Sequence, residues 1–254
     1  DCLAAATVLD EVFALYRLGR IERLSIPPAW LQARLRAAEG AYAEAQALLS
    51  TALATARRLD LPQSLAFTAG EMAALALRCG DLPMAYRAAA VVEAYSVLPN
   101  GLLPSTEVYL APSRMALAGG RAGEALLLLT ALHEQAVANN RGLLVLKALI
   151  LSALAYAVQG EQPAALVALE LAVQQAAPVG FVRAFVDEGA PMYRLLHAYQ
   201  APHTAEDAFV ARLLSAFPAS VIIAEAQLPE PLTDRELTIL RLLAAGYSNQ
   251  AIAT

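Results

Sequence analysis

The chain has 254 residues, of which 58% are hydrophobic, so it holds enough apolar side chains for a large buried core. Its formal net charge of −5 argues against a broad phosphate-binding surface, because affinity for DNA rests mainly on clustered Lys and Arg. Its two cysteines, Cys2 and Cys79, are far apart and indicate neither a disulfide framework nor a zinc site. We therefore expect a protein of the reducing cytoplasm.

A motif of glycine followed five residues later by alanine recurs with a period of 40 residues. Its members are Gly40 and Ala45, Gly80 and Ala85, Gly120 and Ala125, and Gly160 and Ala165. Glycine adopts the left-handed conformation that ends many helices, and a small alanine early in the next helix allows close antiparallel packing. Helix pairs of this kind stack into a curved solenoid with a concave surface. The pattern therefore predicts an all-α superhelical solenoid.

The first of these turns resembles the tetratricopeptide repeat (TPR), whose helix-to-helix turn reads G-x-Y-x-x-A. Gly40, Tyr42 and Ala45 match that pattern. A period of 40 instead of the usual ~34 residues predicts longer helices or turns than in that family. Pro112 falls inside the first helix expected for the third repeat, so we expect this helix to begin late, after a loop at Leu98–Thr106.

The most apolar segment, Gly142–Gly160, has two possible interpretations, a membrane span or a buried helix. Its length is near the lower limit for a span, and it contains Lys147, which is costly in hydrocarbon. An inner helix of a solenoid is flanked by neighbours on both sides and is therefore apolar nearly all round. We expect a buried helix and no membrane partner.

The last residues of the chain carry the start signals of two consecutive helices. Thr233 and Glu236 form a capping box, Gly246 ends the first helix, and Ser248 caps the second. The segment closely resembles the beginning of the LuxR-type helix-turn-helix domain, on positions Leu232, Thr233, Glu236, Leu240, Leu243, Gly246, Ser248 and Ile252. The resemblance implies that the recognition helix would follow Thr254. We therefore expect a truncated domain that is poorly ordered or docked on the repeats.

The segment Gly180–Tyr199 is similar to the stretch that follows the repeats in the large MalT-like (LAL-class) LuxR-type regulators. This resemblance implies a TPR-like sensor domain at residues 1–180, a helical extension at 181–226, a linker at 227–231 and the helix-turn-helix fragment at 232–254. It also implies an ATP-binding domain upstream, promoter DNA as a partner of the full-length protein, and self-association upon activation. The chain itself has no phosphate-binding loop, so we expect no cofactor in it.

Catalytic and metal-binding patterns are not evident in the sequence. The adjacent carboxylates Asp187 and Glu188 do not face each other across a substrate, so a solvated helix end is the better interpretation. The three histidines, His133, His197 and His203, lack the spacing of metal ligands. We therefore predict no catalytic residue, no metal site and no enzymatic activity in this chain.

Aromatic side chains provide candidates for a ligand-binding groove. Trp30 follows two prolines at a helix start and is interpreted either as a core anchor or as a flat apolar platform in the groove. Tyr42, Tyr86 and Tyr156 offer the same choice. Two functions follow: the sensor and relay segment of a transcriptional regulator that binds an unknown small-molecule inducer or protein partner, or a TPR-like interaction scaffold with no transcriptional role.

Overall fold

The structure is a computed structural model that describes residues 7–8, 11, 22–95, 106–199, 206–219 and 221–222. The described residues form helices and turns without a strand, which confirms the predicted all-α class. In chain order the elements are a 3₁₀ helix η1 (Glu22–Ser25), then α2 (Ile26–Ala38), α3 (Tyr42–Arg58), α4 (Pro62–Arg78), α5 (Leu82–Tyr95), α6 (Thr106–Ala118), α7 (Ala122–Ala138), α8 (Gly142–Val158), α9 (Gln162–Ala176), α10 (Arg183–Val186), α11 (Ala190–Ala198) and α12 (Glu206–Ser215).

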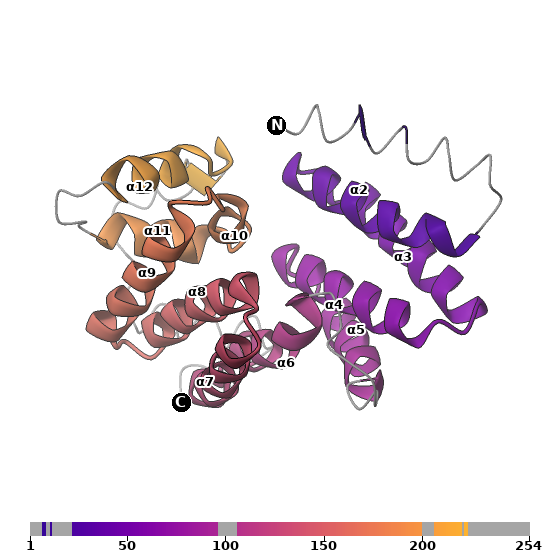
Figure 1. Cartoon of the computed structure of the whole chain (residues 1–254), viewed down its shortest axis with the longest axis horizontal. Coiled ribbons are helices and arrows are strands. Elements are labelled where there is room, and N and C mark those ends of the chain that lie inside the picture. The colour runs from indigo at the N-terminus through magenta and orange to yellow at the C-terminus, as the bar shows by residue number, and fades with distance from the viewer. Residues whose placement is uncertain are drawn as a thin grey trace, which may run out of the picture.

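The helices form four antiparallel pairs, α2 with α3, α4 with α5, α6 with α7, and α8 with α9. Each pair also packs on the next, and the described residues build the predicted helical solenoid. Figure 1 shows the helices arranged as an arch, with α6 and α7 at its apex and α2 and α12 at its two open ends. Helices α10, α11 and α12 continue the second arm, where α10 and α11 contact α8 and α12 contacts α9.

The turns of the solenoid recur every 20 residues, half the period seen in the sequence. Gly40, Gly80, Gly120 and Gly160 have φ between 73° and 82°, and each lies in the turn inside a helix pair. Asp60 and Asn140 occupy the equivalent left-handed position in turns between pairs, with φ of 51° and 54°. Between α2 and α9, six connections in the described part of the chain are only three residues long, so the helices that they join lie antiparallel and alternate between the two faces of the arch.

Backbone hydrogen bonds close these turns in the same way in both kinds of connection. In the first turn, the Ala41 amide donates to the Arg36 carbonyl at 2.8 Å and the Gly40 amide donates to Ala37 at 3.2 Å. This pair of bonds is the Schellman motif, which satisfies the last carbonyls of a helix. Two similar bonds surround Asp60, so an acidic residue replaces glycine there without loss of the motif.

Small side chains line the contact between the helices of each pair. Ala45, Ala85, Ala125 and Ala165 are fully buried. On the preceding helices, the residues seven positions before each turn glycine are also small, and they are at most 2% exposed: Ala33, Ala73, Ser113 and Ala153. Buried small residues allow the two backbones to approach closely.

Helix α6 begins at Thr106, includes Pro112 and has 13 residues, compared with 17 in α4 and α8. Residues 98–105 of the expected loop lie outside the described residues. The start of α6 packs directly on Gly70 of α4, where an added Cβ would lie 2.8 Å from the backbone nitrogen of Val108. The backbone carbon of Glu107 would lie 3.0 Å from the same Cβ, so α6 places Glu107 beside Gly70, the residue before Glu71.

Helix α8 contains most of the apolar segment considered above and has eight buried residues. None of the helices in the described part of the chain is long and apolar enough to cross a membrane. The boundary expected between residues 180 and 181 falls between α9 and α10. The expected linker at 227–231 and the helix-turn-helix fragment at 232–254 lie outside the described residues. The expectation that this fragment is poorly ordered or docked on the repeats concerns the same residues and stays a prediction.

Candidate functional site

A groove of about 1210 Å³ lies on the concave side of the arch. Its walls come from α2, α4, α6 and α8 and from the segment around α10. Much of the lining is apolar, including exposed or half-buried side chains that have no covering layer within the described chain, such as Leu24, Leu31, Leu143 and Phe181. The groove is larger than the ~300–1,000 Å³ typical of small-molecule sites.

Trp30 belongs both to the core and to the groove. Its ring stacks on Phe67 of α4 with centroids 3.6 Å apart and planes 14° apart. Its indole nitrogen donates a hydrogen bond of 2.8 Å to the hydroxyl of Thr68, and the residue lines the groove. The two interpretations of Trp30 are therefore compatible, because one face of the ring is packed while the side chain still borders the open space.

The three candidate tyrosines do not line this groove. Tyr42 and Tyr86 lie on α3 and α5, and these two helices contribute only Leu49 to its lining. Both tyrosines are exposed, and Tyr42 lies under the guanidinium of Arg78 at 5.7 Å. Tyr156 is half-buried near the end of α8 and packs against the main core. Tyr42 and Tyr86 lie outside the groove because the second helix of each pair faces away from the concave side, whereas Tyr156 lies outside it because its side chain packs against the core.

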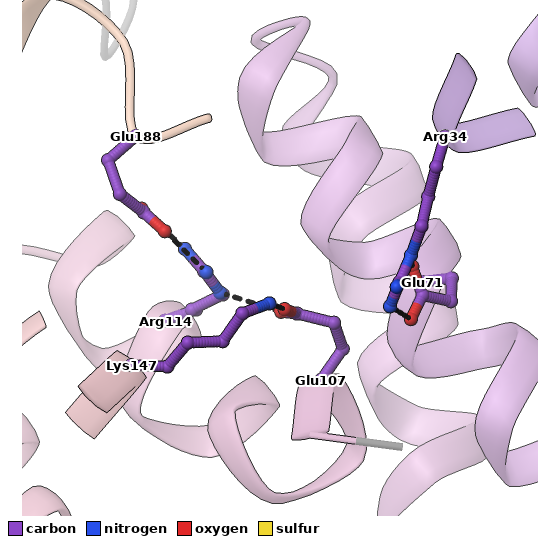
Figure 2. Close-up of polar contacts among 6 residues, drawn as sticks. All are labelled: Arg34, Glu71, Glu107, Arg114, Lys147 and Glu188. Atoms are coloured by element: carbon purple, nitrogen blue, oxygen red, sulfur yellow. Dashed lines mark hydrogen bonds and ion pairs between the residues drawn. The ribbon is translucent and has the colours of Figure 1, made fainter. Parts of the chain in front are cut away.

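Ionic side chains lie at the base of the groove in two groups, which Figure 2 shows side by side. In the first group, Arg34 of α2 donates two hydrogen bonds to Glu71 of α4, at 2.9 and 2.5 Å. Glu71 is 8% exposed, so this bidentate pair joins the first two repeats on their inner side.

The second group joins α6, α8 and the turn after α10. Arg114 donates two hydrogen bonds of 2.7 Å to the carboxylate of Glu188 and a third, of 3.1 Å, to Glu107. The ammonium of Lys147 on α8 also donates to Glu107. The four side chains are 5–17% exposed and neutralise one another.

Protonation in this cluster is set by mutual pairing. Burial alone would raise the pKa of Glu107, but Arg114 and Lys147 outweigh it and lower the pKa to about 2. Burial likewise opposes the charge on Arg114, yet Glu188 and Glu107 raise its pKa above the ordinary value. The Glu107 carboxylate and the Arg114 guanidinium are therefore both ionised at neutral pH.

The interpretation of Asp187 and Glu188 as a solvated helix end is wrong for Glu188. The Glu188 side chain is only 9% exposed, because the turn after α10 places it over Arg114, 74 residues earlier in the chain. Asp187 remains 38% exposed and accepts contacts from two arginines. Arg183 pairs with its Oδ1 from one turn earlier, and Arg78 of α4 approaches the same atom at 3.6 Å.

No local sequence pattern predicted a role for Arg34, Glu71, Glu107 or Arg114, and Lys147 served only as evidence against a membrane span. A signal was present in the repeat period, because Glu107 and Lys147 are 40 residues apart and thus occupy equivalent positions on α6 and α8. Equivalent positions on inner helices face the same groove. Alternating charge at such positions indicates an ionic row across neighbouring repeats.

This architecture defines a helical-repeat protein whose concave surface carries an apolar groove with a paired ionic base, an arrangement suited to binding. Residues 1–201 match the family model described as MalT-like TPR region, and the chain belongs to this family. Residues 230–254 match the model described as bacterial regulatory proteins, luxR family. A comparison with curated proteins gave no match.

The two matches confirm the predicted resemblance to MalT-like regulators of the LuxR family. The chain therefore combines a TPR-like region with a segment that matches the LuxR family and belongs to a regulator of transcription. All eight helix-turn-helix positions named above, from Leu232 to Ile252, fall within the second match.

Proposed function

We propose that the TPR-like region is the sensor and relay segment of the regulator, and that an effector binds in the concave groove. The observation that carries this proposal is the groove of about 1210 Å³, which is open, largely apolar and bordered by four consecutive repeats. This surface combines side chains from helices far apart in sequence, from α2 to α10. An occupant would therefore interact with several repeats at once.

The ion pairs suggest how occupancy would be relayed toward the C-terminus. Arg114 joins α6 to Glu188, and Arg78 joins α4 to Asp187, so both pairs connect the repeats to the turn between α10 and α11. An occupant that alters these contacts would change the position of α10 and of the helices that follow. The occupant shifts the equilibrium between the two positions of these helices only if it binds one arrangement more tightly than the other.

The remaining parts of the mechanism rest on the resemblance to MalT-like regulators. In this proposal, an ATPase domain that binds ATP lies upstream of residue 1 in the full-length protein. Promoter DNA binds the complete LuxR-type domain, and activation is accompanied by self-association. The effector is a small-molecule inducer or a protein partner, and it acts by favouring the self-associating state.

A transcription assay on the complete regulator tests the proposal. Leu31 and Phe181 are 51% and 43% exposed on the groove walls, so Leu31→Glu and Phe181→Glu place a carboxylate on the apolar surface without disturbing the core. The matched control is Leu127→Glu, since Leu127 is 76% exposed on α7 and does not line the groove. We expect both groove variants to lose the response of a reporter promoter to inducing conditions at normal protein level.

The control variant should respond like the wild-type protein. If Leu31→Glu and Phe181→Glu also respond like the wild type, an effector does not use this groove and the proposal fails. The alternative function, an interaction scaffold with no transcriptional role, is disfavoured by the LuxR-family match at residues 230–254.

A further inference from the structure

The charges that line the groove do not balance. Among the described residues in its lining there are five cations and four carboxylates, Arg34, Arg78, Arg114, Lys147, Arg183, Glu71, Glu107, Asp187 and Glu188. Arg34 is matched by Glu71, and the pair of Arg114 and Lys147 is matched by Glu107 and Glu188. The excess positive charge is therefore located at Asp187.

Two guanidinium groups share one carboxylate oxygen at this point. Arg183 forms an ion pair with Oδ1 of Asp187, and Arg78 lies 3.6 Å from the same atom, beyond the usual ~2.7–3.2 Å of a hydrogen bond. Arg183 is 46% exposed and Arg78 is 24% exposed, so both remain accessible from the groove. A second carboxylate placed here would complete the pairing, because a planar guanidinium binds carboxylates in a bidentate manner.

Apolar surface surrounds this charged point on both arms of the arch. Phe181 and Val182 precede Arg183 in the lining, and Leu75 lies one turn before Arg78 on α4. Leu31 and Trp30 extend the apolar wall along α2. A ligand anchored at the two arginines would thus lie against hydrophobic side chains over most of its length.

We propose that the groove selects an organic monocarboxylate with a large apolar body, bound through Arg78 and Arg183. The inference rests on the proposed effector site and gives its ligand class. The apolar body would be held by the leucine and aromatic surface. The carboxylate would lie between the guanidinium groups of Arg78 and Arg183, where Asp187 is the only carboxylate paired with them in the described part of the chain. Neutral and cationic ligands fit the groove less well, because Arg78 and Arg183 would then still share the single carboxylate of Asp187. Uniformly polar ligands fit less well because they leave the apolar walls without a partner.

Binding of matched acid and alcohol probes to the full 254-residue chain tests this selectivity. The aromatic pair is pyrenebutyrate and pyrenebutanol, followed by fluorescence, and the aliphatic pair is dodecanoate and dodecanol, followed by calorimetry. We expect at least one acid to bind about tenfold more tightly than its alcohol, a typical difference for a charge-assisted hydrogen bond. Comparison of the two pairs distinguishes an aromatic from an acyl body.

Three variants locate the selectivity. Arg183→Gln should lower the affinity for the acid about tenfold and leave the affinity for the alcohol unchanged. Asp187→Asn removes the competing carboxylate and should tighten acid binding, a gain that damage to the fold would not produce. Arg87→Gln is the control for net charge, because Arg87 is exposed on α5 outside the groove and should have no effect.

Equal affinity for acid and alcohol, binding of neither, or an unchanged affinity in both Arg183→Gln and Asp187→Asn overturns the ligand class. The reporter assay separates this failure from that of the proposed function. If the probes fail while Leu31→Glu still abolishes the transcriptional response, only the ligand class is wrong. If Leu31→Glu leaves the response intact, the groove is not the effector site at all.

Discussion

Replacement of Glu107 by glutamine should destabilise the chain in a manner that depends on pH. The carboxylate is 5% exposed and accepts hydrogen bonds from both Arg114 and Lys147. Its pKa falls from an ordinary 4.5 to about 2 in the folded protein. At about 1.4 kcal/mol per pH unit, this difference corresponds to a stabilising free energy on the order of 3 kcal/mol.

The direction of the pH dependence follows from the lowered pKa of Glu107. Since the folded protein binds this proton less readily than the unfolded chain, the stabilisation is complete above about pH 4.5 and disappears as pH falls through about 2. We therefore expect Glu107→Gln to lower the free energy of unfolding by about 3 kcal/mol at pH 7, with a difference from wild type that shrinks between pH 4.5 and 2.

Urea unfolding of both proteins, followed by circular dichroism between pH 7 and pH 3, measures this difference. Glu124→Gln is the control, because Glu124 forms an exposed ion pair with Arg121 and its loss should cost less than about 1 kcal/mol at every pH. A Glu107→Gln difference that stays constant from pH 7 to pH 3 would refute the assignment of a buried, ionised carboxylate.

Two further predictions concern the backbone. Gly70→Ala should destabilise the chain by about 1–3 kcal/mol in urea unfolding, because the new Cβ meets the Val108 backbone. Gly123→Ala should be nearly neutral, since its Cβ meets only the end of a flexible glutamine side chain. Equal effects would contradict the close packing of α4 and α6. Gly120→Ala should lower the free energy of unfolding by about 1 kcal/mol from its φ of 73° alone, since the space around it is open. Asn140→Gly should leave this free energy unchanged or raise it slightly. The reverse order of the two effects would refute the left-handed turns.

The sequence predicted the solenoid well where a local rule connects residue type to backbone conformation. Glycine at positions such as Gly40 marks a left-handed turn because it has no Cβ, and its period was readable directly. The alternate turns escaped notice because Asp60 and Asn140 perform the same role with side chains that are common elsewhere. The 20-residue spacing of the turns therefore became evident only from the backbone angles.

The base of the groove could not be predicted in the same way. Several of its ion pairs join distant residues, such as Arg34 with Glu71, 37 positions apart, and Arg114 with Glu188, 74 positions apart. Charged residues at such separations carry no local signature of pairing. Glu188 is an example, since its neighbours in sequence suggest an exposed helix end. The candidate tyrosines show the converse, because an aromatic residue at a repeat position does not reveal which face of the arch its helix presents.

Photo-crosslinking from the groove wall in the complete regulator, within responding cells, tests the central claim most directly. A photoreactive benzoylphenylalanine replaces Leu31 in one variant and Leu127 in another, and the intact mass of each protein is measured after irradiation under inducing conditions. We expect an adduct at position 31, of the mass of a small molecule or of a protein partner, that is absent at position 127 and absent without induction. An unmodified protein at position 31, or the same adduct at both positions, would contradict an effector site in the groove.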